Sequence, residues 1–585
     1  MNKSSLLGKE WIFKKFDNNE VNFIKENFSL NEILSKIISS KKLNREDLSN
    51  YINPIIKNLL PNPQVLRDMT KGIERTYQAI ISNEKIGIFG DYDVDGATST
   101  AFLSRYFKSI KQENEIYIPD RSTEGYGPSK KGFDKLLKDN SKLIFTLDCG
   151  TLAFEPIDYL TKKKIDVIVL DHHQSEINLP NAHSIINPNR LDDDSNLNYL
   201  CAAGVTFMFL VGLNKKLRNE NWFKNNNLTE PNLLNYLDLV SLGTICDVVP
   251  LIGLNRAFVK QGIKILKKKK NIGLKTLIDL CKLDNNLNTY HIGYIIGPRI
   301  NAGGRVGKCT HGAKLLIEED PKSVFTIANE LNTFNYERQN IEKDLLNIVL
   351  NKINNPEKNP IIILVGEKWH EGVIGIIASR IKDKYNKPAI IISFENNVGK
   401  ASARSVTGFD IGSLIISAVQ ENLLIKGGGH KMAGGFSIKR ENVNKFVAFA
   451  NRKITTLNKI YLQKKILMID AEIAPSALNY DFFSKIEILS PFGSGNPEPK
   501  FLIKNLKVVK TKTIKDSHIS CNLLSDSGEM IKCFSFNSFS TNIGGFLLKK
   551  NTNKIDIVGK LSLNEWKGKK NVEFIIDDIS VNKNH

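Results

Sequence analysis

Residues 85–96 read KIGIFGDYDVDG, and this stretch decides the fold class of the chain. Its apolar first part, Lys85–Phe89, predicts a short buried strand, and the residues from Ala97 to Ile110 predict a helix after it. Two further apolar runs, Leu143–Leu147 and Val167–Leu170, also alternate with helical stretches. Strands that alternate with helices in this way are typical of a parallel, doubly wound sheet, so we expect an α/β fold.

Three aspartates follow the first strand at alternate positions: Asp91, Asp93 and Asp95. Alternate side chains of an extended segment point to the same side, so we expect these carboxylates to lie together. The carboxyl ends of strands in an open parallel sheet are also where ligands bind. Three negative charges at such short range repel one another unless a cation neutralises them. The segment therefore predicts a site for a divalent metal ion.

Two other interpretations exist for this acidic segment. A calcium loop of the EF-hand type has carboxylates at its first, third and fifth positions and glycine at its sixth, as Asp91–Gly96 do. However, its closing glutamate would fall at Phe102, and such a loop follows a helix rather than a strand. A solvated acidic turn is the remaining alternative, which acidic residues at other strand ends make the weaker one.

Acidic residues also follow the next two predicted strands. Asp148 comes directly after the second strand, and the triplet Asp171-His172-His173 comes directly after the third. A fourth candidate, Asp247, ends an apolar helical stretch. Imidazole mixed with carboxylate suits Mn²⁺, while a majority of carboxylates also admits Mg²⁺.

The composition allows several kinds of partner. Lys and Arg total 82 against 62 Asp and Glu, a net charge of +20 that suits nucleic acid or an anionic membrane surface. A Lys- and Asn-rich chain can also reflect the base composition of its genome. The seven cysteines form no CxxC pair, so we expect a reducing, cytoplasmic location and no thiolate zinc. Without a signal peptide or an apolar run of about 20 residues, no membrane is expected.

The chain divides into five predicted parts. Residues 1–75 predict short helices interrupted by prolines, and residues 76–320 hold the sheet and a helical block. Residues 321–354 predict a long amphipathic helix that connects two lobes, although an ordinary core helix would show the same spacing. Residues 355–460 predict a second α/β part, and residues 461–585 a small β-barrel of short strands.

Taken in order, the acidic motifs resemble the DHH phosphoesterase superfamily, which is named after the triplet seen here as Asp171-His172-His173. Further motifs resemble the RecJ family of exonucleases within it. These are Gly297–Arg305 (GPRINAGGR), Ala401–Asp410 (ASARSVTGFD), Gly427–Phe436 (GGGHKMAGGF) and Pro491–Pro499 (PFGSGNPEP). The resemblance implies that residues 76–320 form a DHH catalytic domain, 355–460 a DHHA1-like substrate-binding domain and 461–585 an OB-like nucleic-acid-binding domain.

The resemblance also implies a two-metal site that holds Mn²⁺ or Mg²⁺. The implied metal ligands are Asp91, Asp93, Asp95, Asp148, His172 and Asp247, and Asp148 is expected to bridge the two ions. Many relatives outside the RecJ family carry a histidine where Phe89 and Gly90 stand here, so Asp91 is its implied substitute and the division of ligands stays open. The implied catalytic residues are Asp148, His172 and His173. Contacts to the substrate phosphate are expected from His173, Arg299, Asn301, Arg305, Arg404, Gly428, Gly429 and His430.

The function implied by the resemblance is 5′-to-3′ exonuclease activity on single-stranded DNA in repair and recombination. A monomer is expected, with a helicase and a single-strand-binding protein as partners. Two alternatives remain: a DHH enzyme for oligoribonucleotides or cyclic dinucleotides, and a catalytically silent DNA-binding scaffold. The β-rich end and the positive charge count against the first, and the complete acidic set counts against the second.

Overall fold

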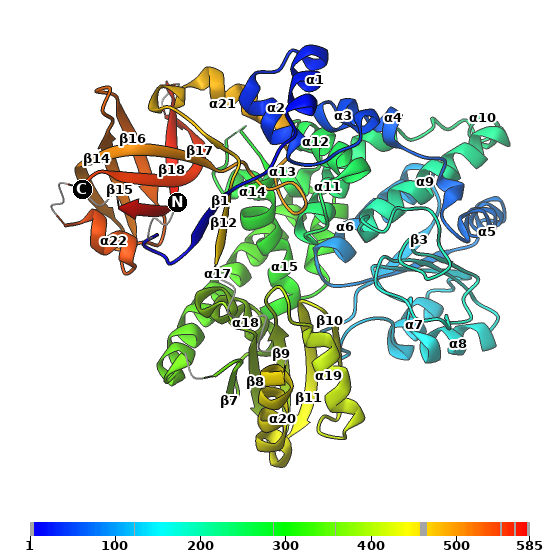
Figure 1. Cartoon of the computed structure of the whole chain (residues 1–585). Coiled ribbons are helices and arrows are strands. Elements are labelled where there is room, and N and C mark those ends of the chain that lie inside the picture. The colour runs from blue at the N-terminus through cyan, green and yellow to red at the C-terminus, as the bar shows by residue number, and fades with distance from the viewer. Residues whose placement is uncertain are drawn as a thin grey trace. The chain divides into compact units, whose positions relative to one another are not determined.

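The computed structural model describes residues 5–121, 123–284, 286–356, 359–456, 465–549, 553–566 and 569–581 (Figure 1). The chain forms two compact units. Unit 1 combines Met1–Leu60, Pro250–Lys260 and Gln463–His585, and unit 2 combines Pro61–Val249 and Gln261–Leu462. No helix among the described residues is both long enough and apolar enough to span a bilayer.

The first sheet of unit 2 has five parallel strands, which confirms the predicted doubly wound α/β fold. Across the sheet they are β3 (Asn114–Tyr117), β2 (Ile86–Gly90), β4 (Leu143–Leu147), β5 (Asp166–Leu170) and β6 (Ser184–Ile186). The chain order along this sheet reverses between β2 and β4, and ligands bind at such a switch point in open α/β sheets. The short strands β3 and β6 are not among the strands that the sequence predicts.

Helices cover both faces of this sheet, as the continuous apolar strands require. On one face Phe145 of β4 packs against Phe107 and Phe209, and on the other Phe89 of β2 packs against Phe133. Figure 1 shows α9 above the sheet and α7 and α8 below it. The covering helices are α5 (Met69–Ile81), α6 (Val94–Ser109), α7 (Lys130–Lys138), α8 (Phe154–Lys162) and α9 (Ala202–Asn219).

A helical block follows, as predicted. It comprises α10 (Trp222–Asn225), α11 (Leu237–Cys246), α12 (Gly253–Leu266), α13 (Ile272–Leu280), α14 (Thr289–His291), the π-helical segment η3 (Ile292–Ile296), α15 (Gly297–Val306) and α16 (His311–Ile317). The long connecting helix is confirmed as α17 (Pro321–Lys352), which packs against α13, α15 and α18. The expected boundary between residues 75 and 76 lies inside α5.

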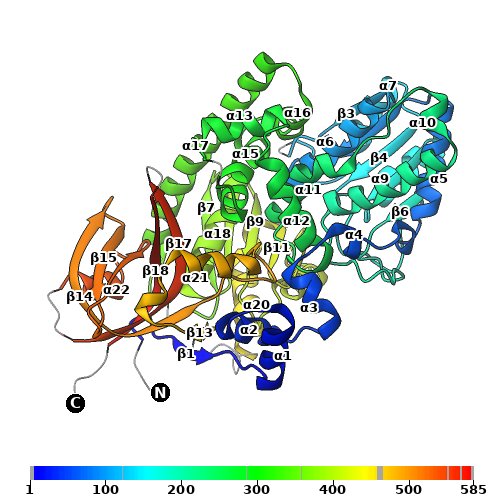
Figure 2. The ribbon, with the colours of Figure 1, turned by 90° about the horizontal axis from the view of Figure 1, so that it is seen from above.

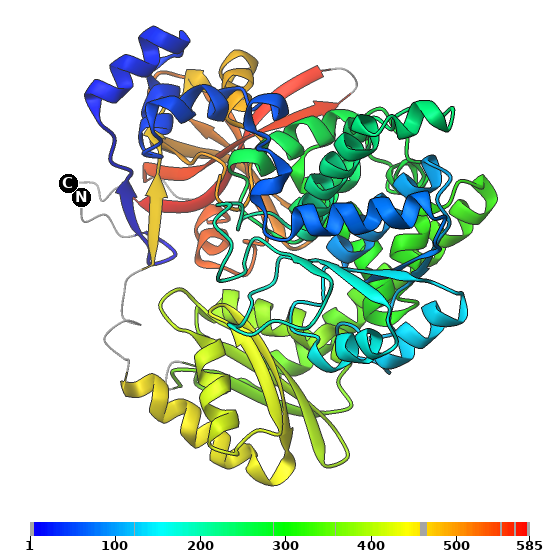
Figure 3. The ribbon, with the colours of Figure 1, turned by 90° about the vertical axis from the view of Figure 1, so that its right-hand side faces the viewer.

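The second sheet of unit 2 is mixed, because only its strands β7 and β8 pair in parallel. Across the sheet the strands are β10 (Lys426–His430), β11 (Ala433–Lys439), β9 (Val398–Arg404), β8 (Ala389–Glu395) and β7 (Ile362–Glu367). Its helices are α18 (Glu371–Tyr385), α19 (Ile411–Gln420) and α20 (Val443–Thr456). This part is drawn in yellow-green at the bottom of Figure 3.

Unit 1 contains the predicted small β-barrel (Figure 2). Its strands are β13 (Ala471–Glu472), β14 (Phe501–Ile514), β15 (His518–Leu524), β16 (Met530–Ser535), β18 (Lys569–Val581) and β17 (Ile555–Trp566), in spatial order. The long strand β14 bends at a register shift and pairs with both β15 and β17, which closes the barrel. Helices α21 (Tyr480–Ile486) and α22 (Asn542–Leu547) complete it.

The N-terminal residues belong to the same unit as the barrel. Their helices are α1 (Asn18–Phe28), α2 (Glu32–Ser39), α3 (Arg45–Ile52) and α4 (Ile56–Leu59). Ile24 and Ile38 share one core with Phe501 and Ile557. In addition β1 (Glu10–Phe13), which the sequence does not predict, pairs in parallel with β12 (Ile466–Ile469), as Figure 3 shows in blue and orange.

Candidate metal centre

Three aspartates stand at the same edge of the parallel sheet because backbone pairing continues one residue past each strand. The amide of Asp91 donates to the carbonyl of Leu147 (3.2 Å), and the amide of Asp148 donates to that of Leu170 (3.0 Å). The amide of Asp171 donates to Ile186 in the same way (3.2 Å). Asp148 adopts a φ of 59°, so the chain turns sharply there and leaves the sheet.

The segment after β2 is not extended, which corrects one expectation. Helix α6 begins at Val94, and the carboxylate of Asp93 caps it by accepting a hydrogen bond from the amide of Gly96 (3.0 Å). Asp95 therefore lies in the first helical turn and faces a different neighbour. Its carboxylate accepts hydrogen bonds from the amides of Ala202 (2.6 Å) and Ala203 (3.0 Å) at the start of α9.

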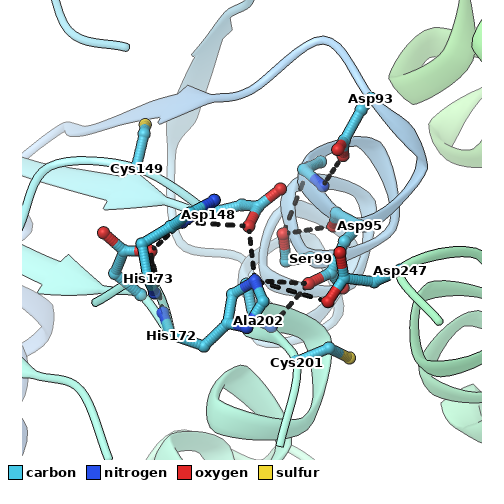
Figure 4. Close-up of polar contacts among 12 residues, drawn as sticks. Asp93, Asp95, Ser99, Asp148, Cys149, His172, His173, Cys201, Ala202 and Asp247 are labelled. Carbon is cyan, nitrogen blue, oxygen red and sulfur yellow. Dashed lines mark hydrogen bonds and ion pairs between the residues drawn. The ribbon is translucent and has the colours of Figure 1, made fainter. Parts of the chain in front are cut away.

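The predicted ligands nevertheless come together. Asp91, Asp93 and Asp148 form one group and Asp95, His172 and Asp247 form another, while a third group of Asp148, His172 and His173 overlaps both; within each, possible ligand atoms lie within 4.8 Å of one another. His172 joins them: its Nε2 lies 3.2 Å from Oδ1 of Asp148, 3.5 Å from Oδ2 of Asp247 and 3.8 Å from Oδ2 of Asp95 (Figure 4). The geometry thus provides two adjoining clusters of metal-ligand atoms.

Two glycines permit this close assembly. A Cβ atom on Gly96 would lie 2.5 Å from the carbonyl oxygen of Asp91, and one on Gly243 would lie 2.4 Å from Oδ1 of Asp95. Any side chain at Gly243 would therefore separate α11 from Asp95. Because Asp247 caps the C-terminus of α11, that separation would also move Asp247.

The electrostatics of the centre favour protonated carboxyl groups when no cation is bound. Burial and the neighbouring aspartates raise the pKa of Asp148 well above its usual range, and burial and Asp93 do the same for Asp91. Burial together with Asp95 and Asp93 raises the pKa of Asp247 to about 8. Burial lowers the pKa of His172, which therefore keeps a neutral, metal-binding ring. A divalent cation would offset the repulsion that causes these shifts.

Three buried atoms test whether the centre fits metal ions. They are Oδ1 of Asp91, Oδ1 of Asp148 and Nε2 of His172, and none has a hydrogen-bond partner among the described residues. A buried polar atom without a partner costs free energy unless something else satisfies it. Two carboxylate oxygens and one imidazole nitrogen are ligands that Mn²⁺ accepts, and the oxygens also suit Mg²⁺. The residues at this centre therefore fit Mn²⁺ or Mg²⁺.

Asp171 turns away from this cluster and orients the histidines. It accepts hydrogen bonds from the amides of Thr151 (3.1 Å) and His172 (2.7 Å), and from Nδ1 of His173 (2.8 Å). Burial works to raise its pKa, but the bond and charge of His173 outweigh burial and hold the pKa below its usual value. Burial likewise opposes the charged form of His173, yet Asp171 raises the pKa of His173 to about 9.

Tyr126 contacts the centre and is not predicted from the sequence. Its hydroxyl donates to the carbonyl oxygen of Asp148 (3.1 Å) and lies 3.1 Å from Nε2 of His173. The same hydroxyl lies 3.3 Å from Nδ1 of His173, so Tyr126 packs beside the ring that Asp171 holds through Nδ1. The sequence does offer one signal for this loop, because Tyr126 is flanked by Gly125 and Gly127. Both glycines adopt positive φ in the loop after β3.

A cluster of arginines contains two of the predicted phosphate contacts. Burial, together with the charges of Arg121, Arg338 and Arg404, lowers the pKa of Arg305 to about 10. Arg305 donates from Nη1 to the carbonyl of Gly372 (3.0 Å), and Arg404 donates to Oγ of Ser402 (3.1 Å). The positive charges of these three arginines disfavour a further cation at Arg305, so this region favours an anion, although Arg338 itself forms an ion pair with Glu342 (2.8 Å). Arg121 and Arg338 are members that the sequence does not predict.

The other predicted phosphate contacts have different surroundings. Arg299 donates to Oδ1 of Asn332 (2.9 Å) and to the carbonyl of Ile295 (2.7 Å), and Asn301 is half-buried on α15. Gly428, Gly429 and His430 are exposed on β10, at the edge of the second sheet. Among the described contacts, none joins Arg299 or His430 to the acidic cluster.

Comparison with known proteins agrees with this architecture. Models of three domains match the chain: "DHH family, N-terminal domain" over residues 85–244, "DHHA1 domain" over 357–456 and "RecJ OB domain" over 469–578. RecJ of Escherichia coli, named a single-stranded-DNA-specific exonuclease, is 30% identical over 537 residues, which is 90% of this chain and 92% of that protein. The protein of the same name from Bacillus subtilis is 28% identical over 583 residues, 98% of this chain and 71% of that one.

Solved structures show the same fold. RecJ of Thermus thermophilus in complex with Mn²⁺ superposes with a TM-score of 0.81 at 24% identity, covering 99% of this chain and 80% of that one. A structure described as exonuclease RecJ bound to manganese gives a TM-score of 0.57 at 30% identity, covering 68% of this chain and 96% of that chain. With the three domain models, the switch-point aspartates and near-complete coverage of the E. coli relative, this chain belongs to the RecJ family of DHH proteins.

Proposed function

We propose that this chain is a metal-dependent exonuclease that hydrolyses single-stranded DNA from its 5′ end. The observation that carries the proposal is the pair of ligand clusters joined by the 3.2 Å contact between His172 and Asp148. The names of the E. coli and B. subtilis relatives support the substrate and the exonuclease activity. The 5′-to-3′ direction rests on the resemblance to the RecJ family.

We assign two divalent cations, Mn²⁺ or Mg²⁺, to the two clusters. Asp91, Asp93 and Asp148 would hold one, Asp95, His172 and Asp247 would hold the other, and Asp148 would bridge them. Bound together, such cations lower the pKa of a water molecule and offset negative charge on phosphoryl oxygens. The two RecJ structures described with manganese support this choice of metal.

The remaining groups would bind and orient the phosphodiester. Three members of the arginine cluster, Arg121, Arg305 and Arg404, would donate hydrogen bonds to the phosphoryl oxygens, because forked guanidinium donors match that geometry. His173, oriented by Asp171 and Tyr126, would donate a hydrogen bond to the same phosphate. Asn301 and the exposed backbone of Gly428 and Gly429 would contact the strand further along, and we keep Arg299 and His430 as candidates there.

Two alternatives are weaker on these observations. The match of the RecJ OB model to residues 469–578 counts against a DHH enzyme for oligoribonucleotides or cyclic dinucleotides. A silent DNA-binding scaffold has no use for an intact metal centre, whereas all six candidate ligands are present and lie together. OB-type barrels bind single strands by stacking and charge, which supports a role in holding DNA.

The decisive experiment follows a long single strand labelled at its 3′ end. With Mn²⁺ present, we expect the 3′-labelled strand to shorten progressively and a copy labelled at its 5′ end to release its label at once in a short product, while a duplex of the same sequence persists. A dinucleotide and a single-stranded RNA serve as competing substrates. Hydrolysis of the dinucleotide alone would contradict the proposal, and strand binding without any hydrolysis would support the scaffold instead.

We also propose a monomer that acts in the cytoplasm with a helicase and a single-strand-binding protein. We retain the domain boundaries at residues 320, 354 and 460 and place the first boundary before α5, because residue 75 lies inside that helix. All seven cysteines are free, which supports a reducing compartment. Pull-down from cell extract and gel filtration of the pure protein would test the partners and the monomer.

A further inference from the structure

Two tyrosines on one helix face of unit 2 form an exposed aromatic pair. Tyr290 and Tyr294 lie one helical turn apart, and their rings stack with centroids 5.2 Å apart and planes inclined by 27°. They are 59% and 73% exposed, respectively. The opposite face of the same segment buries Ile292 and Ile296 completely, so packing of the helix does not require aromatic rings on the outer face.

The segment that carries this pair packs against the helix that ends at a metal-cluster residue. Segment η3, which carries Tyr294, packs against α11, and Asp247 caps that helix. A Cβ atom on Gly293 would lie 3.3 Å from Cγ2 of Ile245, and Sγ of Cys246 lies 3.9 Å from the carbonyl oxygen of Ile292. The tyrosines therefore stand on backbone that touches the residues directly before Asp247.

The backbone at this point is also unusual. Residues Ile292–Ile296 form a π-helix between the α-helical segments α14 and α15. Such π-helical turns are rare and occur often at functional sites. In the next turn, Arg299 brings a guanidinium group beside the same segment through its bond to the carbonyl of Ile295. Aromatic faces next to a positive charge are the usual composition of a surface that binds single strands.

We propose that Tyr290 and Tyr294 form a stacking platform for a nucleobase of the single strand whose backbone is cleaved at the neighbouring centre. This proposal deepens the function proposed above and rests on it. Every base, whatever its identity, has a flat π-face that can stack on the outer tyrosine ring, so the platform adds affinity without sequence preference. It also selects a strand that carries unpaired bases over a bare phosphodiester chain.

The test compares two ligands of equal charge on the full-length protein. One is oligothymidylate of about 20 nucleotides, and the other is an abasic strand of the same length, both measured with EDTA present so that no hydrolysis occurs. The variants are the double substitutions Tyr290→Ala with Tyr294→Ala, and Tyr290→Phe with Tyr294→Phe. Phe325→Ala, which removes another exposed ring of unit 2, is the matched control.

The wild-type protein is expected to prefer the base-bearing strand, and the double Ala variant should bind that strand about tenfold more weakly. Its affinity for the abasic strand should not change, and the double Phe variant should keep the wild-type preference because its rings remain. A double Ala variant that keeps the wild-type ratio of affinities overturns the platform, and so does equal loss on both strands. An absence of Mn²⁺-dependent cleavage in the wild type would overturn the proposed function separately.

Discussion

Nε2 of His172 lies 3.2 Å from Oδ1 of Asp148, although the two residues follow different strands and both atoms are buried. The contact joins the two ligand clusters. Neither atom has a hydrogen-bond partner among the described residues, and their mutual approach does not replace one. The two atoms are placed to bind the same ligand, and a divalent cation would serve as the missing partner of both.

Replacing Asp148 should therefore abolish catalysis without abolishing strand binding. We expect Asp148→Ala to have no measurable Mn²⁺-dependent nuclease activity, because the cluster of Asp91 and Asp93 loses a ligand and the proposed bridge between the two ions is removed. Binding of labelled single strands should remain within a few fold of wild type. Asp158→Asn, which changes an exposed aspartate on α8, is the control. Undiminished cleavage by Asp148→Ala would refute the metal assignment.

Removing the charge of Asp148 should abolish activity but should stabilise the metal-free protein. Asp148→Asn removes one of several mutually repelling carboxyl groups, so we expect thermal unfolding without divalent ions to occur at a higher temperature than in wild type. Adding Mn²⁺ at 100 times its dissociation constant should stabilise the wild-type protein by about 2.7 kcal/mol for each ion that binds. The variant should show a much smaller increase. Equal Mn²⁺-induced shifts in both proteins would contradict a ligand role for Asp148.

Tyr126 should act on turnover rather than on folding. The substitution Tyr126→Phe keeps the ring beside His173 but removes the hydroxyl that bonds to Asp148 and approaches Nε2. We expect kcat to fall about 10- to 100-fold with little change in KM, since outer hydrogen bonds of a metal site have effects of that size. The unfolding temperature should not change. A rise in KM with constant kcat would indicate substrate contact instead.

Arg404 should affect binding of the DNA backbone. Because it belongs to the arginine cluster, Arg404→Ala should weaken binding of a single strand about tenfold or more, and it should reduce the dependence of affinity on salt concentration. Arg404→Lys should restore part of the affinity. Arg440→Ala, which breaks an exposed ion pair with Glu367, should leave both quantities unchanged. The same salt dependence in Arg404→Ala and wild type would exclude a phosphate contact.

Asp238 makes the stability depend on pH. Burial raises the pKa of this α11 carboxyl to about 6, above the ordinary value of 3.8. Between these two values the folded state holds a proton that the unfolded state has lost, so stability falls as the pH rises through this range. Asp238→Asn should abolish this pH-dependent loss of stability, which is about 2 to 3 kcal/mol, so the variant should be more stable than wild type at pH 7. Urea unfolding at pH 4 and pH 7 measures the free energy of unfolding of both proteins. The same change in that free energy between the two pH values in wild type and variant would contradict the prediction.

Much of this centre could be predicted because its signals are local. Asp91, Asp148 and the triplet at Asp171 each follow an apolar run, and parallel strands bring such positions to one edge of a sheet. The expected geometry of Asp95 was wrong because helix α6 begins one residue before it. The cap that Asp93 forms with Gly96 marks that start. The alternate spacing of the three aspartates is equally compatible with an extended segment, so it does not reveal the helix.

The parts that could not be predicted depend on distant contacts. Arg121 and Arg338 lie far from Arg305 in the chain, and only tertiary folding brings their charges together. The loop of Tyr126 follows β3, a four-residue strand whose sequence NEIY is too polar to indicate a buried strand. Similarly, β1 becomes a strand because β12 pairs with it, which no local pattern of Glu10–Phe13 reveals.

That pairing has a consequence for how the protein is made. Domains of a chain under synthesis generally fold from the N-terminus onward, but the N-terminal residues here form one compact unit with Pro250–Lys260 and with the residues from Gln463 onward. Ser5, for example, bridges to Ser580, and β1 waits for β12. During synthesis the N-terminal helices therefore emerge long before the barrel residues with which Ile24 and Ile38 share their core, and that core closes only after these residues have been made.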